Sequence, residues 1–480
     1  MTATTHPAPA PAGRPVSRTT LYLFGALGGI LFGYDLGIIS GVLPFIGKQW
    51  HLDSWDKGVV TASVSVGAVV GAAISAKVNL RFGRRHTIQA AALIVLVMTI
   101  FTSTAPSFHV LTLARFAVGI GIGLSSSTVP TYMSELAPAR LRGGLGALNQ
   151  IFIVLGILIA FITSYCLGEI GGDYGHWRWM MAGAAVPALV LLIGLQRLPE
   201  TPRWLLTRGR DDEAAAVLLQ AHGCQESADA ELATLRAVIA DTAATTRGRL
   251  RDLWRPMVRP MLIVAILLAA GQQLSGVNAI NAYFPTMLIS LGFATQAALL
   301  SGVLLGLSKF IFTAWVVFVV DKWGRKPLLL IGSILMAVTL AGAGFVSTTV
   351  HETDARGLLM LVLIIMYLVG YELGWGAVVW VMCSEVFPLR DRASGMAVAS
   401  VVLWSFTGIV TAVFPLISAK SGLGLGGAMY LFAGVNVVLF LLVRWLVPET
   451  KGRSLEEIEI DLRHGKDVVT EHAQQVTPAA

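Results

Sequence analysis

The 480-residue sequence contains few charged residues. Asp, Glu, Lys and Arg make up 13% of it, against about a quarter in soluble domains, while hydrophobic residues make up 55%. This balance excludes an ordinary water-soluble enzyme. A spanning helix needs about 20 apolar residues, so a mean hydropathy of +0.72 leaves room for roughly a dozen crossings. We therefore expect a multi-pass membrane protein.

Cysteine and nucleotide-binding motifs are equally scarce. The three cysteines, Cys166, Cys224 and Cys383, are scattered and predict neither a disulfide framework nor a metal site. There is no Walker motif, no GxGxxG after a strand and no His/Cys cluster with metal spacing. ATP-driven transport and membrane-bound catalysis are disfavoured. We expect a protein that is not an enzyme and has no cofactor.

Apolar segments divide the chain into six spans, a polar break and six more spans. They fall at 20–43, 58–79, 87–105, 110–133, 146–167, 179–196, 260–288, 296–320, 327–347, 358–383, 394–418 and 425–446. The predicted parts are a tail at 1–19, a six-helix bundle at 20–197, a helical linker at 198–257, a second six-helix bundle at 258–447 and a tail at 448–480.

Basic residues lie in the gaps between the apolar segments. Arginines crowd the break, beside the helix-forming runs DDEAAAVLLQ and DAELATLRAVIA, and others follow the second, fourth, eighth and tenth spans. The basic residues behind the net charge of +7 therefore indicate membrane topology and not a nucleic-acid-binding site. The positive-inside rule predicts that both termini and the linker are cytoplasmic, in a plasma membrane whose anionic lipids the basic loops would contact.

Three motifs recur after half a chain. The pairs are RFGRR at 81–85 with KWGRK at 322–326, SELAPARLR at 134–142 with SEVFPLRDR at 384–392, and PETPRW at 199–204 with PETKGR at 448–453. The offsets are 241, 250 and 249 residues, so two homologous halves follow one another in parallel.

These motifs, together with QQLSGVNAINAY at 272–283, resemble those of the sugar porter branch of the major facilitator superfamily. The resemblance covers about residues 20–460. It implies an all-α fold of twelve transmembrane helices in two six-helix bundles, with a substrate site between them near the midplane that opens alternately to each side.

Charge inside a span is costly enough to indicate function. Five ionisable residues stand out: Asp35, Arg115, Lys309, Glu372 and, near a cytoplasmic end, Glu385. With a rise of about 1.5 Å per residue, Asp35 lies roughly 22 Å from the inner face and Arg115 roughly 8 Å from the outer face of a core about 30 Å thick. The two depths coincide, so Asp35 and Arg115 can face each other. In proton-coupled porters that resemble this chain, a GYD aspartate and a fourth-span arginine form the coupling pair, and both match here. This predicts proton symport; the alternative is a static ion pair.

Lys309 and Glu372 share a depth near mid-membrane. The sugar porters that this chain resembles typically carry an asparagine where Lys309 stands. Three hypotheses remain open: a purely structural pair with Glu372, a cation that recognises an acidic substrate, or a lysine that loses its charge on burial and donates hydrogen bonds as a neutral amine.

The seventh span is rich in amides, which can donate to and accept from sugar hydroxyls. Gln272, Gln273, Asn278 and Asn281 surround Gly276, which suggests a broken helix lining a cavity. Interhelical hydrogen bonding is the alternative. The resemblance places Gln272, Gln273, Asn278, Gln150 and Trp380 on sugar-contacting positions, adds Phe32 to the lining of the same cavity and assigns Tyr283 to an external gate. Asn281, Lys309 and Trp404 complete the predicted substrate site.

Several positions depart from the family pattern. Ala282 precedes Tyr283 where many relatives have two tyrosines, Leu403 precedes Trp404 where an amide is common, and Ala377 replaces a common proline. These departures put the substrate more in doubt than the mechanism.

Basic turns and acidic residues predict a cytoplasmic gate. It consists of Arg84, Arg85, Glu135, Arg142, Asp321, Arg325, Glu385 and Arg392, bridging to one another and to carbonyls at helix ends. The first-half motif has Leu80 where an acid is common, so one side of the gate is expected to be weaker.

Taken together, the residues predict a monomeric secondary transporter that imports a monosaccharide or polyol with protons. A proton-coupled importer of a sugar acid or other organic anion, suggested by Lys309, and a simple sugar facilitator, opposed by Asp35, are the alternatives. A membrane sensor is disfavoured because the tails are short.

Overall fold

The computed structural model describes residues 27–136, 142–170, 176–244, 253–256, 258–376, 378–387 and 391–451. These residues contain helices and no strands, and twelve helical segments are long and apolar enough to cross a membrane. The predicted all-α fold with twelve spans is therefore confirmed. The predicted tail at 1–19 and most of that at 448–480 lie outside the described residues.

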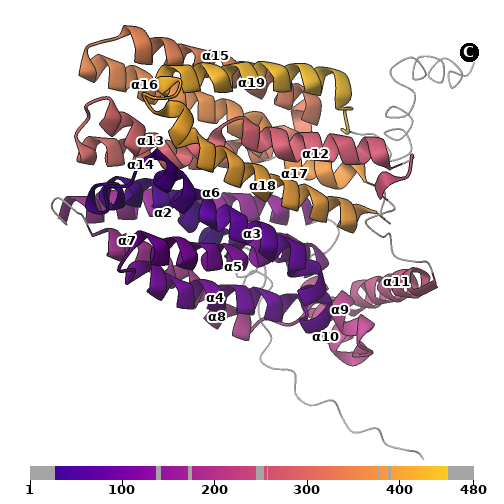
Figure 1. Cartoon of the computed structure of the whole chain (residues 1–480). Coiled ribbons are helices and arrows are strands. Elements are labelled where there is room, and N and C mark those ends of the chain that lie inside the picture. The colour runs from indigo at the N-terminus through magenta and orange to yellow at the C-terminus, as the bar shows by residue number, and fades with distance from the viewer. Residues whose placement is uncertain are drawn as a thin grey trace, which may run out of the picture.

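The first six spans form one bundle (Figure 1). Its helices are α2 (Gly28–Gln49), α3 (Ser54–Phe82), α4 (Arg84–Ser103), α5 (Phe108–Leu136), α6 (Arg142–Ile170), and α7 (Trp177–Ala182) followed by α8 (Ala185–Gln196). Apolar side chains remain exposed on its outer surface: Leu113 is 70% exposed and Ile170 is 71% exposed. A surface of this kind fits lipid better than water.

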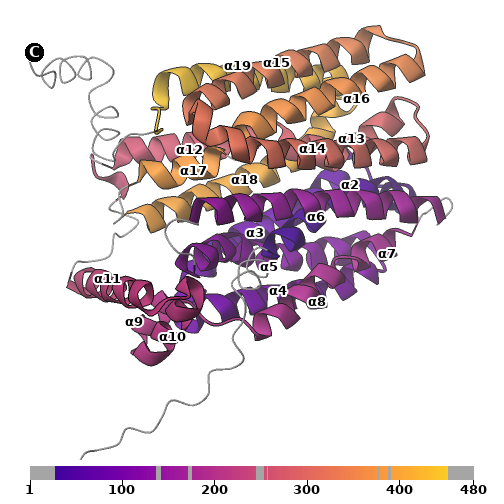
Figure 2. The same ribbon diagram turned by 180° about the vertical axis from the view of Figure 1, so that it is seen from behind.

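The last six spans form the second bundle, stacked against the first in both views (Figures 1 and 2). It contains α12 (Arg259–Leu274), α13 (Val277–Ser290), α14 (Thr295–Trp323), α15 (Arg325–Thr349), α16 (Thr353–Gly370), the π-helical turn η4 (Tyr371–Gly376), α17 (Val378–Val386), α18 (Arg392–Ser418) and α19 (Gly424–Leu446).

Three short helices connect the bundles at one end of the molecule (Figure 1). They are α9 (Pro202–Thr207), α10 (Asp211–His222) and α11 (Gln225–Ala244), so the two predicted linker helices are present. Thr201 caps α9 and Trp204 Nε1 donates to the Leu80 carbonyl at the end of α3. We call this end of the bundle the linker end and the opposite one the far end.

The repeated motifs adopt the same local structure in both halves. Gly83 joins α3 to α4 and Gly324 joins α14 to α15, each with a φ of 90°. This left-handed conformation favours glycine, and it turns the chain sharply between two long helices. The second-half turn therefore repeats the first.

Two spans of the second bundle are interrupted. Gly276, with a φ of 99°, separates α12 from α13, which confirms the broken helix expected at the amide-rich segment. The tenth span instead contains the π-helical turn η4, which the sequence did not indicate. π-Helical turns inside α-helices are rare and frequently mark functional sites.

The bundles meet mainly through α3 with α18, α6 with α14 and α2 with α13. The approach is close where small residues allow it: a Cβ added to Gly58 of α3 would lie 2.2 Å from the Ala412 carbonyl oxygen of α18. Because Gly58 is near the start of α3, this contact holds the two halves together at the far end.

Candidate functional site

A buried ion pair lies between α2 and α5. Asp35 Oδ1 is 3.6 Å from Arg115 Nη1, and the two residues are 6% and 1% exposed. The proximity expected from their depths is therefore present. Arg115 is fixed further by a hydrogen bond from its Nε to the Val60 carbonyl, at 3.1 Å. Charge-assisted hydrogen bonds usually span about 2.7–2.9 Å, so this pair is loose.

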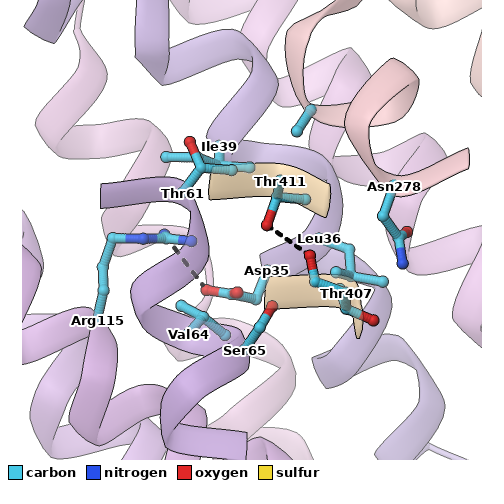
Figure 3. A pocket seen from close by; sticks show the side chains of 11 residues that line it. Asp35, Leu36, Ile39, Thr61, Val64, Ser65, Arg115, Asn278, Thr407 and Thr411 are labelled. Atoms are coloured by element: carbon cyan, nitrogen blue, oxygen red, sulfur yellow. Dashed lines mark hydrogen bonds and ion pairs between the residues drawn. The ribbon is translucent and has the colours of Figure 1, made fainter. Parts of the chain in front are cut away.

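The second carboxylate oxygen of Asp35 has no hydrogen-bond partner among the described residues. The residue lines a cavity of about 20 Å³, enough for a water molecule. Figure 3 shows Asp35 between Arg115 and residues of α18. The same cavity is bounded by Asn278 of the broken seventh span. The ion pair and the amide-rich segment thus share one space between the bundles.

The side-chain hydroxyls that α18 contributes to this cavity have already donated their hydrogens. Thr407 Oγ1 donates to the Leu403 carbonyl at 2.8 Å, and Thr411 Oγ1 donates to the Thr407 carbonyl at 2.7 Å. A hydroxyl carries one hydrogen and two lone pairs, so both threonines retain only acceptor capacity. This wall of the cavity suits a hydrogen-bond donor better than a carboxylate anion.

The seventh-span amides form a continuous hydrogen-bonded row, which we call the amide row. Asn278 Nδ2 donates to Gln273 Oε1 at 2.6 Å, and Gln273 Nε2 donates to Gln272 Oε1 at 3.2 Å. Gln272 Nε2 then donates to the Trp375 carbonyl of η4 at 2.6 Å. Asn281 is buried, and neither atom of its amide has a partner among the described residues. The row leaves amide groups available to bind a polyhydroxylated ligand.

Aromatic residues link the two bundles. Phe32 of α2 packs edge to face on Trp404 of α18, with ring centroids 5.2 Å apart. Trp404 Nε1 also donates to Ser126 Oγ of α5 at 3.3 Å. Gln150 in α6 and Trp380 in α17 are half-buried. Their predicted contact with a substrate stays a prediction.

Tyr283 connects the halves at the far end. Its hydroxyl lies 2.9 Å from the Thr411 carbonyl of α18 and 3.1 Å from the Lys57 carbonyl of α3, and can donate to either. Its ring stacks on Phe414 with centroids 5.3 Å apart. This position suits the predicted gate, because the residue bridges the bundles where they would have to part.

Lys309 and Glu372 form a second buried pair, inside the C-terminal bundle. Lys309 Nζ of α14 is 3.5 Å from Glu372 Oε1 of η4, and the residues are 6% and 1% exposed. The other carboxylate oxygen accepts a hydrogen bond from Thr313 Oγ1 at 2.9 Å. The ammonium also lies 5.5 Å from the centre of the Tyr371 ring. Of the three hypotheses for Lys309, the first, a pair with Glu372, has this geometric support.

At the linker end, the predicted gate residues form contacts within each half. Arg84 Nη2 lies 2.9 Å from Glu135 Oε1, and Arg325 Nη2 lies 3.2 Å from Glu385 Oε1. Arg85 donates to two carbonyls at the end of α8, those of Leu195 and Gln196. The side chains of Arg142, Asp321 and Arg392 lie outside the described part of the chain. A gating role for these residues stays a prediction.

Two further carboxylates complete this network, and neither was among the gate residues predicted from the sequence. Glu200 accepts from the backbone N–H groups of Arg84 and Arg85, which begin α4. Glu449 accepts equivalently from the N–H groups that begin α15, at 3.0 Å each. Carboxylates are favourable at helix N-termini because the first N–H groups have no partner within the helix. The signal for these glutamates in the sequence was the repeated PET motif. Its two glutamates occupy equivalent places in the two halves.

Comparisons with known proteins agree with this geometry. The model of the family "Sugar (and other) transporter" matches residues 21–462. The D-xylose transporter of Levilactobacillus brevis is 38% identical over 456 residues, covering 94% of this chain and 97% of the relative. The galactose-proton symporter of Escherichia coli (strain K12) is 33% identical over 460 residues, covering 95% and 97%.

The solved structures that resemble this one include the inward-open conformation of the xylose transporter XylE from E. coli. It shares 28% sequence identity with a TM-score of 0.79, and the match covers 92% of this chain and 99% of that one. Family model, relatives and structure cover nearly the whole chain, so the protein belongs to the sugar porter family of the major facilitator superfamily.

Proposed function

We propose that this protein imports a monosaccharide or polyol together with protons, by alternating access between its two bundles. The observation that carries the proposal is the loose, buried Asp35–Arg115 pair, which shares a cavity with Asn278 of the amide row. Relatives named as a D-xylose transporter, a galactose-proton symporter and a myo-inositol transporter support neutral polyhydroxylated substrates.

Asp35 carries the proton in this proposal. As an anion it is attracted to Arg115, but the cavity that it lines is also lined by Thr407 and Thr411, whose hydroxyls already donate to carbonyls of their own helix. When protonated, its hydroxyl can donate to their oxygens, directly or through one water molecule. Packing α18 against α3 at the far end therefore favours the proton-loaded carboxyl. Closing the far end without a proton leaves a carboxylate in a cavity to which the α18 hydroxyls offer only acceptors, which is unfavourable.

The substrate is held by the amide row, with Phe32, Gln150, Trp380 and Trp404 as the aromatic and polar contacts from the neighbouring helices. Amides suit a sugar because each one offers both donors and an acceptor to adjacent hydroxyls. The rings of Phe32, Trp380 and Trp404 would pack on the C–H side of the sugar ring. The proton gradient supplies the energy, and no cofactor takes part.

We further propose that the protein acts as a monomer in the cell membrane with both termini and the linker in the cytoplasm. The basic loops of the linker end support this orientation through the positive-inside rule. The far end, which Tyr283 and the Gly58 contact close here, then faces outward, and the structure corresponds to a state closed toward the outside.

The test is accumulation of a labelled neutral sugar in proteoliposomes under an imposed pH difference. With one proton per sugar, a difference of one pH unit supports about tenfold accumulation. Asp35→Asn should reduce accumulation to the equilibrium level while sugar exchange persists, and the exposed Asp354→Asn should behave as wild type. Retained accumulation in Asp35→Asn would refute proton coupling through this residue. Uptake without accumulation by the wild type would indicate a facilitator.

A further inference from the structure

The Lys309–Glu372 pair is separate from the proton pair and from the amide row, yet it is connected to the amide row through the backbone of η4. Glu372 is the second residue of that turn. Its carboxylate accepts a hydrogen bond from Thr313 of α14, at 2.9 Å, and forms an ion pair with Lys309 Nζ of the same helix, at 3.5 Å. The turn is therefore tied to a neighbouring helix through one side chain.

The same turn supplies the acceptors at which the amide row ends. Gln272 Nε2 donates to the carbonyls of Trp375 at 2.6 Å and of Gly376 at 3.4 Å. A π-helical turn departs from regular α-helical hydrogen bonding, and carbonyls at such a departure become available to side chains. The Gln272 amide donates to these carbonyls. Through that amide, the turn orients the side chains of Gln273 and Asn278.

The glutamate also packs on the backbone of the turn. A Cβ added to Gly376 would lie 2.5 Å from Glu372 Oε2. Moving the carboxylate thus moves the segment whose carbonyls hold Gln272. Trp375 is fixed independently, since its Nε1 donates to Ser333 Oγ at 2.8 Å and its side chain is fully buried. The turn is anchored on two sides, by Glu372 to α14 and by Trp375 to α15.

Charge balance determines what Lys309 can do. An ammonium buried at 6% exposure needs a compensating anion, and Glu372 provides one inside the same bundle. A lysine whose charge is balanced by a neighbouring carboxylate attracts an acidic substrate only weakly. The pair therefore fits a transporter of neutral molecules, in which both charges serve the geometry of the turn.

We propose that Lys309 and Glu372 are positioning residues, which fix η4 so that its carbonyls orient the amide row for the sugar. This inference rests on the proposed function. The charge pair of α14 and η4 acts on the substrate only through Gln272 and the amides that follow it.

The experiment compares wild type, Lys309→Met, Glu372→Gln and the double variant in proteoliposomes. KM and Vmax are measured for a neutral sugar, and the sugar acid glucuronate is tested as substrate and competitor. Lys309→Met should raise KM about fivefold, the equivalent of one hydrogen bond of the row, with Vmax within about twofold. Glu372→Gln keeps an acceptor for Thr313 but leaves the buried Lys309 ammonium without its anion, so it should raise KM by a similar factor. The double variant should not exceed Lys309→Met, since no uncompensated charge remains.

An unchanged KM in folded Lys309→Met would overturn the inference. So would glucuronate transport by the wild type that Lys309→Met abolishes, because Lys309 would then be the counter-charge of the substrate. If Lys309→Met does not fold, Thr313→Val loosens the same carboxylate without changing any charge. It should raise KM about three- to tenfold, and no change in KM would equally overturn the inference. Absence of neutral-sugar uptake by the wild type would instead contradict the proposed function.

Discussion

The hydroxyl of Tyr283 offers a direct test of how the far end is closed. In the present structure it lies 3.1 Å from the Lys57 carbonyl of the other half and 2.9 Å from the Thr411 carbonyl of its own. Tyr283→Phe removes this hydrogen bond and keeps the ring that stacks on Phe414. The hydroxyl shares its one hydrogen between these two carbonyls, and the contact with the Lys57 carbonyl exists only while the far end is closed. Its loss should therefore shift the equilibrium toward the state open at the far end.

The magnitude follows from the net value of one hydrogen bond. A net contribution of about 1 kcal/mol corresponds to about a fivefold change in an equilibrium constant. Tyr367→Phe is a matched control, because the buried Tyr367 hydroxyl donates at 3.1 Å to the Ser275 carbonyl within the C-terminal bundle. Tyr367→Phe removes one tyrosine hydroxyl and its hydrogen bond but no contact between the halves.

The assay is the labelling rate of a cysteine in the cavity by a membrane-impermeant thiol reagent added from the far side. Ser65→Cys places this cysteine on the cavity wall. The background replaces the native Cys166, Cys224 and Cys383. Tyr283→Phe should accelerate labelling about fivefold and Tyr367→Phe should leave it unchanged. Equal rates in the parent and Tyr283→Phe, or equal acceleration by both substitutions, would refute the reasoning.

Two other predictions concern packing and the linker end. Gly33→Ala should prevent correct packing of α2 on α6, because the new Cβ would lie 1.8 Å from the Ile153 carbonyl oxygen. Gly434→Ala is the control and should fold, because a Cβ added there has nothing within 4 Å. The expression yield and the transport rate of the two variants check this. Glu200→Gln should lower the thermal unfolding temperature, because a charge-assisted acceptor for the first N–H groups of α4 contributes about 1.5–3 kcal/mol. Glu213→Gln, which changes an exposed residue, is the control and should leave the unfolding temperature unchanged. An unfolding temperature as high as that of the parent in Glu200→Gln would contradict the assigned contacts.

The parts of the structure that the sequence predicted depend on local pattern and on depth. Apolar length indicated the twelve spans, and Gly276 among amides indicated the break in the seventh. Counting residues along antiparallel helices was sufficient to bring Asp35 to the depth of Arg115. Burial within a membrane makes charge rare, so each such residue stands out in the sequence.

The parts that it did not predict depend on contacts between distant segments. The π-helical turn follows a run of ordinary helix formers, and its partners Gln272 and Thr313 come from other spans. The acceptors that Glu200 and Glu449 provide lie more than a hundred residues from the helices they stabilise. A repeated motif marks such residues as related, but only the folded arrangement shows which helix end each one meets.

The central claim is that a proton crosses with each neutral sugar through Asp35, and substrate-induced current tests it most directly. Proteoliposomes at zero initial voltage and matched pH receive xylose, galactose or myo-inositol, and the charge movement is recorded. The account predicts an inward positive current from at least one of these neutral compounds in the wild type and none in Asp35→Asn. Sugar uptake without current, or the same current in Asp35→Asn, would contradict it.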